Sequence, residues 1–211
     1  MNKKTIILLL AIVLSISSFG QRKEKKLVQQ SFDNYKSAIL NGNGVEAIKY
    51  VDSRTFSYYS DILDKTKNAD SLALDSLDAM DKLIILSVRH RATKKEILAF
   101  NGKTLLIYAI KEGLISKNSV ENSKIGDVKI DGDFAKGQFV VNGKKAPLYF
   151  HFYKENKAWK VDLTSVFPMA RAAFRQMIDE SRVEENKYLL MLLEITTGKK
   201  ANKDIWEIIQ K

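Results

Sequence analysis

The hydrophobic pattern of the chain changes its period at about Lys124. Upstream, apolar residues recur every three or four positions, as they do from Lys25 to Leu40, and this spacing is typical of amphipathic helices. Downstream, short alternating runs are separated by turn residues. Asn142-Gly143 is the strongest hairpin signal among them, because both residues tolerate the positive φ of a type I′ turn. The chain therefore predicts an α+β fold with N-terminal helices, a four-stranded antiparallel meander and additional C-terminal helices.

The boundaries of these elements follow from turn and capping signals. Before the meander, the spacing predicts one long helix from Asp70 to Arg91, and Thr93 with Glu96 predicts a capping box for the next helix. After it, Pro168 ends the sheet and Ser181 with Glu184 predicts a second capping box. The expected strands are Val128–Ile130, Phe134–Val141, Leu148–Lys154 and Trp159–Val166, with the last turn at Glu155-Asn156.

Residues 1–20 have the order of a secretory signal peptide. Asn2-Lys3-Lys4 is a short basic region, Ile6 to Leu14 is an unbroken apolar run, and Ser18-Phe19-Gly20 is a small-x-small cleavage site. The apolar run is shorter than the ~20 residues that a membrane-spanning helix needs. We expect cleavage after Gly20 and a chain exported to the periplasm or the cell exterior, with no membrane span after cleavage. An uncleaved anchor is the alternative.

Composition excludes several kinds of chemistry. The chain has no cysteine, so it has no disulfide, no thiolate nucleophile and no Cys-ligated zinc. Its formal net charge is +10, and a basic surface attracts anionic lipid, polysaccharide or nucleic acid. However, acidic residues are mixed among the basic ones, as Glu24 is between Arg22 and Lys26. We interpret the charge as a solubility feature, and we expect no nucleic-acid partner, no cofactor and no metal.

Two stretches of the chain resemble the nuclear transport factor two-like superfamily, which includes ketosteroid isomerase-like and SnoaL-like domains. One stretch is FDNYKSAILNG at 32–42 with FSYY at 56–59, and the other is KAWKVDL at 157–163. The resemblance covers residues 25–65 and 124–167. It implies a curved sheet that wraps a long helix into a cone, often with a ligand pocket at its mouth. Residues 70–119 would then be a helical insertion and 168–211 a helical extension of one domain, 21–211.

His151 is the more suggestive of the two histidines. Tyr149, His151 and Tyr153 alternate along their strand and therefore share one face. If Asp162 lies on the same side of the next strand, its carboxylate would raise the pKa of the imidazole and orient it as a general base. The alternative is a half-exposed sheet face on which aromatic side chains pack across strands. The resemblance carries over no catalytic residue, so His151 and Asp162 are candidates on chemistry alone.

A ligand in the cone would need aromatic and polar side chains that converge on it. The aromatic residues at 56–59 are expected to belong both to the core and to the lining of the cone. The candidate ligand-binding residues are Tyr149, His151, Tyr153, Phe56 and Tyr59.

A weaker candidate is an anion site at the end of the long helix. Arg89 and Arg91 flank His90, and two guanidinium groups can clamp a carboxylate or a phosphate. The alternative is structural, because cations at a helix C-terminus complement its negative dipole end and bond its last carbonyls.

These observations leave three functional hypotheses. The leading one is an exported, non-catalytic binding module that holds a small apolar or anionic ligand in the cone, or engages a protein partner or a second copy through the added helices. The first alternative is an isomerase- or hydrolase-type enzyme that uses His151 and Asp162. The second alternative is an envelope-interaction or immunity-type protein without a pocket.

Overall fold

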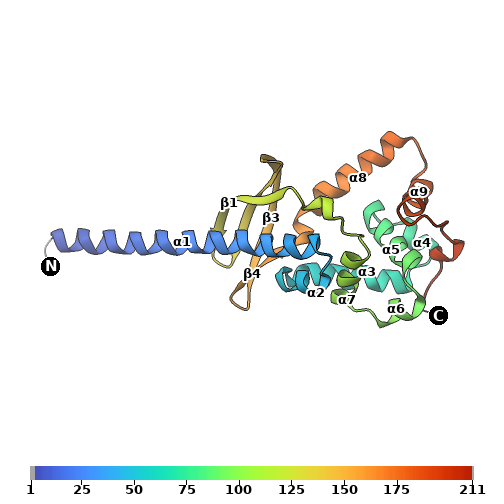
Figure 1. Cartoon of the computed structure of the whole chain (residues 1–211), viewed down its shortest axis with the longest axis horizontal. Coiled ribbons are helices and arrows are strands. Elements are labelled where there is room, and N and C mark those ends of the chain that lie inside the picture. The colour runs from blue at the N-terminus through green and yellow to red at the C-terminus, as the bar shows by residue number, and fades with distance from the viewer. Residues whose placement is uncertain (1–2, 211) are drawn as a thin grey trace.

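The computed structural model describes the backbone of residues 3–210 and the side chains of residues 20–210. It confirms the α+β class, with helices first, then a sheet, then helices (Figure 1). The sheet is open and antiparallel, with its four strands in chain order. The strands are β1 (Ser123–Asp131), β2 (Phe134–Val141), β3 (Lys144–Glu155) and β4 (Ala158–Asp162).

The hairpin turns lie close to their predicted positions. Asn142 and Gly143 have φ values of 50° and 75°, which confirms the positive-φ turn between β2 and β3. Between β3 and β4, the positive φ values belong to Asn156 and Lys157, so this turn lies one residue later than Glu155-Asn156. Glu155 instead ends β3 and pairs with Ala158.

The last strand is shorter than the prediction of Trp159–Val166. It ends at Asp162, and residues Leu163–Val166 form a 3-10 helix, η3. The physical reason is local, because the Asp162 carboxylate accepts a hydrogen bond from the backbone N–H of Thr164 at 2.9 Å. Asp side chains compete with the sheet ladder in this way, and they favour a turn or a cap.

Helix α1 (Lys3–Leu40) lies across one face of the sheet, and its N-terminal part projects beyond the rest of the molecule (Figure 1). Its buried side chains include Val28, Phe32 and Tyr35. The Phe32 ring lies 5.3 Å from Phe150 of β3 and 6.1 Å from Phe139 of β2, measured between centroids. These contacts join the helix and the sheet into one apolar core.

The remaining helices form a second layer beside α1 and the sheet. Helix α5 does not begin at Asp70, because Asp78 accepts a hydrogen bond from the Met80 N–H and starts a new helix there. The capping box of Thr93 and Glu96 is confirmed. The elements before the sheet are α2 (Gly44–Ala47), η1 (Ile48–Tyr50), α3 (Ser53–Asn68), α4 (Ser71–Asp75), α5 (Ala79–Arg91), α6 (Lys94–Ala99), α7 (Gly102–Lys111) and η2 (Lys117–Ser119).

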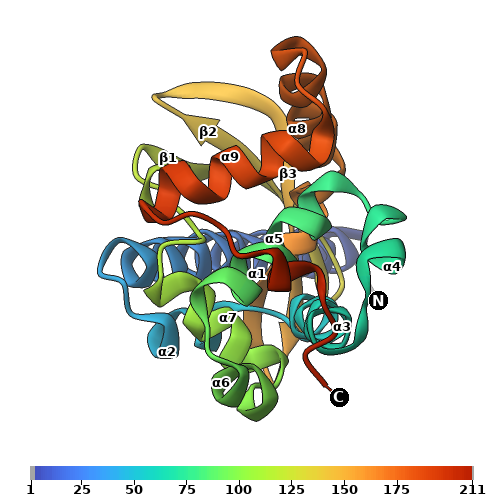
Figure 2. The same cartoon turned by 90° about the vertical axis from the view of Figure 1, so that its right-hand side faces the viewer.

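The C-terminal helices are α8 (Phe167–Ser181), α9 (Glu185–Thr197) and η4 (Lys203–Trp206), and Pro168 lies in the first turn of α8 (Figure 2). The predicted capping box of Ser181 and Glu184 is wrong. Ser181 is the last residue of α8, and its hydroxyl donates to the Ile178 carbonyl. Glu184 caps α9 alone by accepting from two backbone N–H groups.

Helix α1 continues through the predicted cleavage site between Gly20 and Gln21. Residues 1 and 2 and the side chains of 3–19 lie outside the described part of the chain, so the signal peptide stays a prediction. Among the helices that the structure describes, none combines the length and the apolar character of a membrane span.

Candidate functional site

His151 and Asp162 face each other across β3 and β4. They are paired in the antiparallel register, so their side chains leave the same face of the sheet. The Asp162 carboxylate is bound elsewhere, because its Oδ1 accepts hydrogen bonds from the backbone N–H of Thr164 at 2.9 Å and from its hydroxyl at 2.6 Å. Among the described residues, no hydrogen bond joins this carboxylate to the imidazole. The two candidates are neighbours, but Asp162 does not orient His151.

The electrostatics of His151 also differ from those of an activated base. Its pKa lies below the ordinary value of 6.5, first because partial burial disfavours the charged imidazolium, and second because Lys136 lies nearby. The Asp162 carboxylate raises the pKa, but it is the smallest of the three causes. His151 is therefore neutral at about pH 7 and lacks the oriented carboxylate that the catalytic hypothesis requires.

The sheet face that carries His151 is aromatic and basic. The Phe134 ring lies 5.2 Å from the His151 ring and 5.1 Å from the Tyr153 ring. The Arg54 guanidinium lies 3.4 Å from the centroid of Tyr153, and Tyr149 is 45% exposed. The three strand candidates thus share one face, as the alternation predicts. His151 and Tyr153 pack against Phe134 in the cross-strand aromatic arrangement that is the alternative to catalysis.

The two helix candidates lie elsewhere. Tyr59 is buried in the core, where burial raises the pKa of its hydroxyl and its ring contacts Tyr58 at 5.4 Å. Phe56 is half-buried where α3 meets α7, and the Lys103 ammonium lies 5.0 Å from its ring. Among the described residues, no ring contact joins Phe56 or Tyr59 to the three strand candidates. The five predicted ligand residues therefore do not form one site.

The structure separates the two arginines of the predicted anion site. Arg89 is buried, and burial lowers the pKa of its guanidinium to about 10. Arg91 lies at the end of α5 and donates to the Thr196 hydroxyl at 3.2 Å. Backbone carbonyls engage most of the Arg89 donors, since its guanidinium donates to the carbonyls of Lys65, Thr66, Ala69 and Ile205. Arg89 is therefore held by the fold and is not free to clamp an anion together with Arg91.

A wide groove lies between the sheet-crossing part of α1 and the edge strand β1. Its volume is about 1030 Å³, near the upper end of the ~300–1,000 Å³ range of small-molecule sites. We call it the basic groove. Its lining residues are Arg22, Lys23, Lys25, Lys26, Gln29, Gly126, Asp127, Val128 and Lys129.

The shape of the basic groove depends on a bulge in β1. The register with β2 shifts at Gly126 and Asp127, which leaves these two residues out of the ladder. A side chain at 126 has no room, because a Cβ there would lie 2.9 Å from a methyl carbon of Val140. The Gln29 amide donates to the Gly126 carbonyl at 2.8 Å. This bond holds α1 against the bulge, so the groove is a fixed part of the fold.

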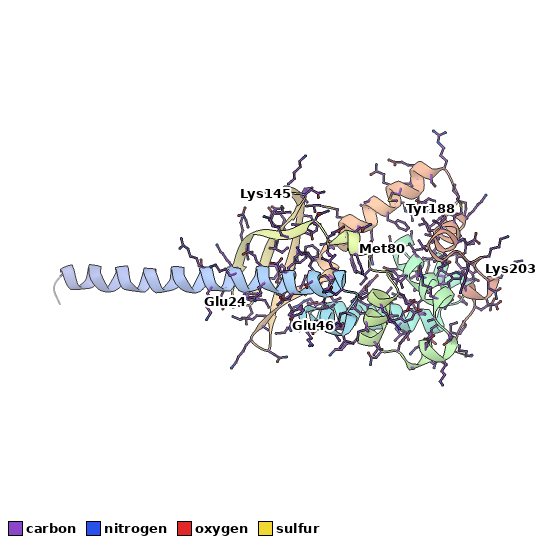
Figure 3. All side chains as sticks on the ribbon, in the orientation of Figure 1. Glu24, Glu46, Met80, Lys145, Tyr188 and Lys203 are labelled. Carbon is purple, nitrogen blue, oxygen red and sulfur yellow. The ribbon has the colours of Figure 1, made fainter. Side chains whose placement is uncertain are left out.

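The charges around the basic groove are separated by sign. Its one acidic residue, Asp127, lies 2.6 Å from the Lys145 ammonium. Glu24 accepts hydrogen bonds from the Lys154 ammonium at 2.9 Å and the Trp159 indole at 2.7 Å, and these partners lower its pKa. Figure 3 labels Glu24 on α1 and Lys145 at the β2–β3 hairpin. Among the described residues, no ion pair within 4 Å involves Arg22, Lys23, Lys25, Lys26 or Lys129.

These side chains determine what the groove can bind. Ammonium and guanidinium groups are donors only, so they bind phosphate, sulfate or carboxylate and repel metal cations. Among the described residues, no group of three His, Asp or Glu side chains is placed to hold a metal ion. The groove therefore favours an anionic ligand.

The chain matches no family model, no curated protein and no solved structure. The resemblance to the nuclear transport factor two-like superfamily therefore stays a prediction.

Sequence reasoning missed the basic groove, although a signal was present. Arg22, Lys25, Lys26 and Gln29 recur at the i, i+3, i+4, i+7 spacing of one helix face. Glu24 lies off that face. Acidic and basic residues that are mixed along the sequence therefore lie on different faces of the helix. The contribution of Lys129 comes from a strand about a hundred residues away and needed the fold.

Proposed function

We propose that the protein is an exported, non-catalytic binding module whose basic groove binds a ligand with several anionic groups. The observation that carries this proposal is the separation of charge on α1. Five cations line the groove and form no ion pair within 4 Å in the part of the chain that the structure describes, while Glu24 in the same run is bound to Lys154 and Trp159. Like charges held close together repel one another, and an anionic ligand relieves that repulsion.

The type of cation indicates how the ligand is recognised. Four of the five are lysines, and an ammonium is a compact charge without the rigid fork of a guanidinium. Such a groove recognises charge density rather than one molecular shape. Phosphate groups repeated along a polymer, or presented by lipid headgroups, share the chemistry that it selects. Binding of this kind weakens steeply with salt, because each neutralised anion releases counterions.

The test compares two variants with the same change in net charge. The groove variant combines Arg22→Gln, Lys25→Gln, Lys26→Gln and Lys129→Gln. The control variant combines Arg182→Gln, Lys94→Gln, Lys95→Gln and Lys200→Gln, all of which are exposed and lie outside the groove. Fluorescence anisotropy with labelled inorganic polyphosphate, at several salt concentrations, gives the affinity and its salt dependence for each protein.

We expect the groove variant to bind at least about tenfold more weakly, with a log–log salt slope lower by about three. The control variant should match the wild type. Equal weakening of both variants would show that net charge, and not the groove, attracts polyphosphate. A parallel titration with phosphatidylglycerol vesicles, with and without polyphosphate as competitor, distinguishes a headgroup source from a free phosphate polymer.

The other hypotheses gain no comparable support. The enzyme alternative needs Asp162 to orient His151, and that carboxylate is bound to Thr164. Export, a protein partner and a second copy of the chain stay predictions.

A further inference from the structure

A second hollow lies on the helical side of the molecule, between α5, α9 and the turn that follows α7. We call it the Arg91 cleft. It consists of two adjoining cavities of about 430 and 250 Å³, which share Arg91, Glu112 and Thr196. The proposed function uses the basic groove and leaves this cleft without a role.

One end of the Arg91 cleft is apolar. Leu83, Ser87 and Arg91 follow one another at four-residue spacing on α5, so they line up along one side of that helix. Leu114, after α7, and Leu193 of α9 add further apolar lining around them. The cleft therefore runs from an apolar end at Leu83 to a cationic end at Arg91, which is about 12 Å along the helix axis.

Arg91 has donors to spare. Its Nη2 donates to the Thr196 hydroxyl at 3.2 Å, while its Nε is buried and has no hydrogen-bond partner among the described residues. A buried donor without a partner is costly. Arg89, two residues earlier, shows the contrast, because four backbone carbonyls engage it. The Nε–H and an Nη–H of a guanidinium together form the fork that binds a carboxylate in two places.

The adjoining cavity adds a second cation, Lys199, at this end. His90 and Lys199 line it together with Arg91. The His90 Nε2 lies 3.0 Å from the Thr197 hydroxyl, which fixes the ring at the edge of the cavity. A ligand at Arg91 thus meets donors on one side and leucine side chains on the other.

We propose that the Arg91 cleft binds a small carboxylate with an aliphatic tail. The carboxylate accepts from the guanidinium of Arg91, and the tail lies against Leu83, Leu114 and Leu193. The guanidinium gains a charged acceptor, and the apolar lining is removed from water. Neither a purely apolar ligand nor a small inorganic anion satisfies both halves of the cleft.

Glu112 provides a second test of the proposal. Its carboxylate lines both cavities, yet among the described residues it forms no ion pair within 4 Å with Arg91. A bound carboxylate would be repelled by this charge. We therefore expect Glu112→Gln to tighten carboxylate binding while Arg91→Gln weakens it.

Titration of the protein with carboxyl-labelled decanoate, followed by NMR and by calorimetry, tests the proposal. We expect saturable one-to-one binding, a dissociation constant raised about tenfold or more by Arg91→Gln, and no change with Arg182→Gln, an exposed arginine outside the cleft. Arg91→Lys keeps the charge without the fork and should fall between wild type and Arg91→Gln. Thermal unfolding of each variant confirms that it is folded.

Two comparison ligands separate the halves of the cleft. Decanol carries the tail without the charge and acetate carries the charge without the tail, so both should bind far more weakly than decanoate. Decanol binding as tight as that of decanoate, or decanoate binding that Arg91→Gln leaves unchanged, would overturn the proposal. Loss of decanoate binding would leave polyphosphate binding at the basic groove intact, so the two proposals fail separately.

Discussion

In the basic groove, five cations lie together, and none forms an ion pair within 4 Å with another described residue. Between α5, α8 and α9, by contrast, positive and negative side chains are paired with one another. There, the Lys82 side chain is only 3% exposed, and its ammonium lies 2.8 Å from the Glu185 carboxylate and 3.5 Å from that of Asp75. The Arg171 guanidinium lies 2.7 Å from Asp81. We call this second region the ion network. Its members are Asp75, Asp78, Asp81, Lys82, Arg171, Arg175 and Glu185.

The difference between the two regions shows which charged side chains stabilise the fold and which are available to a ligand. The pKa of Glu185 shows the compensation: burial acts to raise it, and Lys82 and Arg175 outweigh burial, so it lies below the ordinary value. Charges taken from water need such partners, since a buried charge without one is strongly destabilising. The groove cations stay in contact with water and have no such need, so their clustering requires a different explanation.

The largest effect should come from breaking the ion network. Glu185→Gln leaves the buried Lys82 without its closest acidic partner, and we expect a loss of about 3 kcal/mol in the free energy of unfolding. Urea denaturation followed by circular dichroism measures it. The double variant Lys82→Met/Glu185→Leu removes both charges and should lose much less, because apolar residues can replace a buried ion pair. A double variant as unstable as Glu185→Gln would contradict this account.

Glu24 is the intermediate case, because it is a paired charge next to the unpaired ones. Its pKa is held below the ordinary 4.5 first by its hydrogen bonds to Lys154 and Trp159. The stability that a depressed carboxyl pKa contributes is present above the unfolded value and lost as the pH falls through the folded value. We expect Glu24→Gln to cost less than about 1 kcal/mol at neutral pH. Wild type should also lose more stability than Glu24→Gln on acidification below about pH 5.

Much of the fold could be predicted from sequence because local signals agree with the tertiary structure. The Asn142-Gly143 turn and the Thr93 capping box are both where their residue types place them. The predicted element boundaries were wrong where the hydrogen-bond partner of a side chain could not be read from the sequence. Asp162 ends β4 by bonding Thr164, and Asp78 starts α5 by capping it, yet the hydrophobic period runs through both positions.

The sites could be predicted less well, since a site depends on which side chains already have partners. Arg89 and Arg91 look equivalent in the sequence, but four backbone carbonyls accept hydrogen bonds from Arg89, while the Nε of Arg91 has no acceptor in the described part of the chain. The shared face of Tyr149, His151 and Tyr153 followed from strand alternation. Nothing in the sequence placed Lys129 beside α1.

Removing the charges of the basic groove should have a smaller effect on the free energy of unfolding. The quadruple variant with Arg22→Gln, Lys25→Gln, Lys26→Gln and Lys129→Gln removes mutual repulsion, and among the described residues it removes no ion pair within 4 Å. We expect its free energy of unfolding to be unchanged or up to about 0.5 kcal/mol higher, with the gain largest at low salt. The exposed control variant defined for polyphosphate binding should show no such gain. A clear loss of stability in the groove variant would mean that these cations hold the fold, as those of the ion network do.

The smallest effect on stability concerns His151. Whether stability falls or rises on acidification distinguishes a packed His151 from a catalytic one. Its pKa is lowered by burial and by Lys136, so the fold disfavours the protonated ring, and stability should be lost as the pH falls below the ordinary 6.5. His151→Gln should lose less stability than wild type between about pH 7.5 and pH 5.5, and Lys136→Gln should reduce the wild-type loss. A catalytic pair with Asp162 would raise the pKa and reverse the sign, because stability would then increase on acidification. Urea unfolding of the three proteins at both pH values therefore decides whether His151 is a packed surface residue or the base of an unrecognised active site.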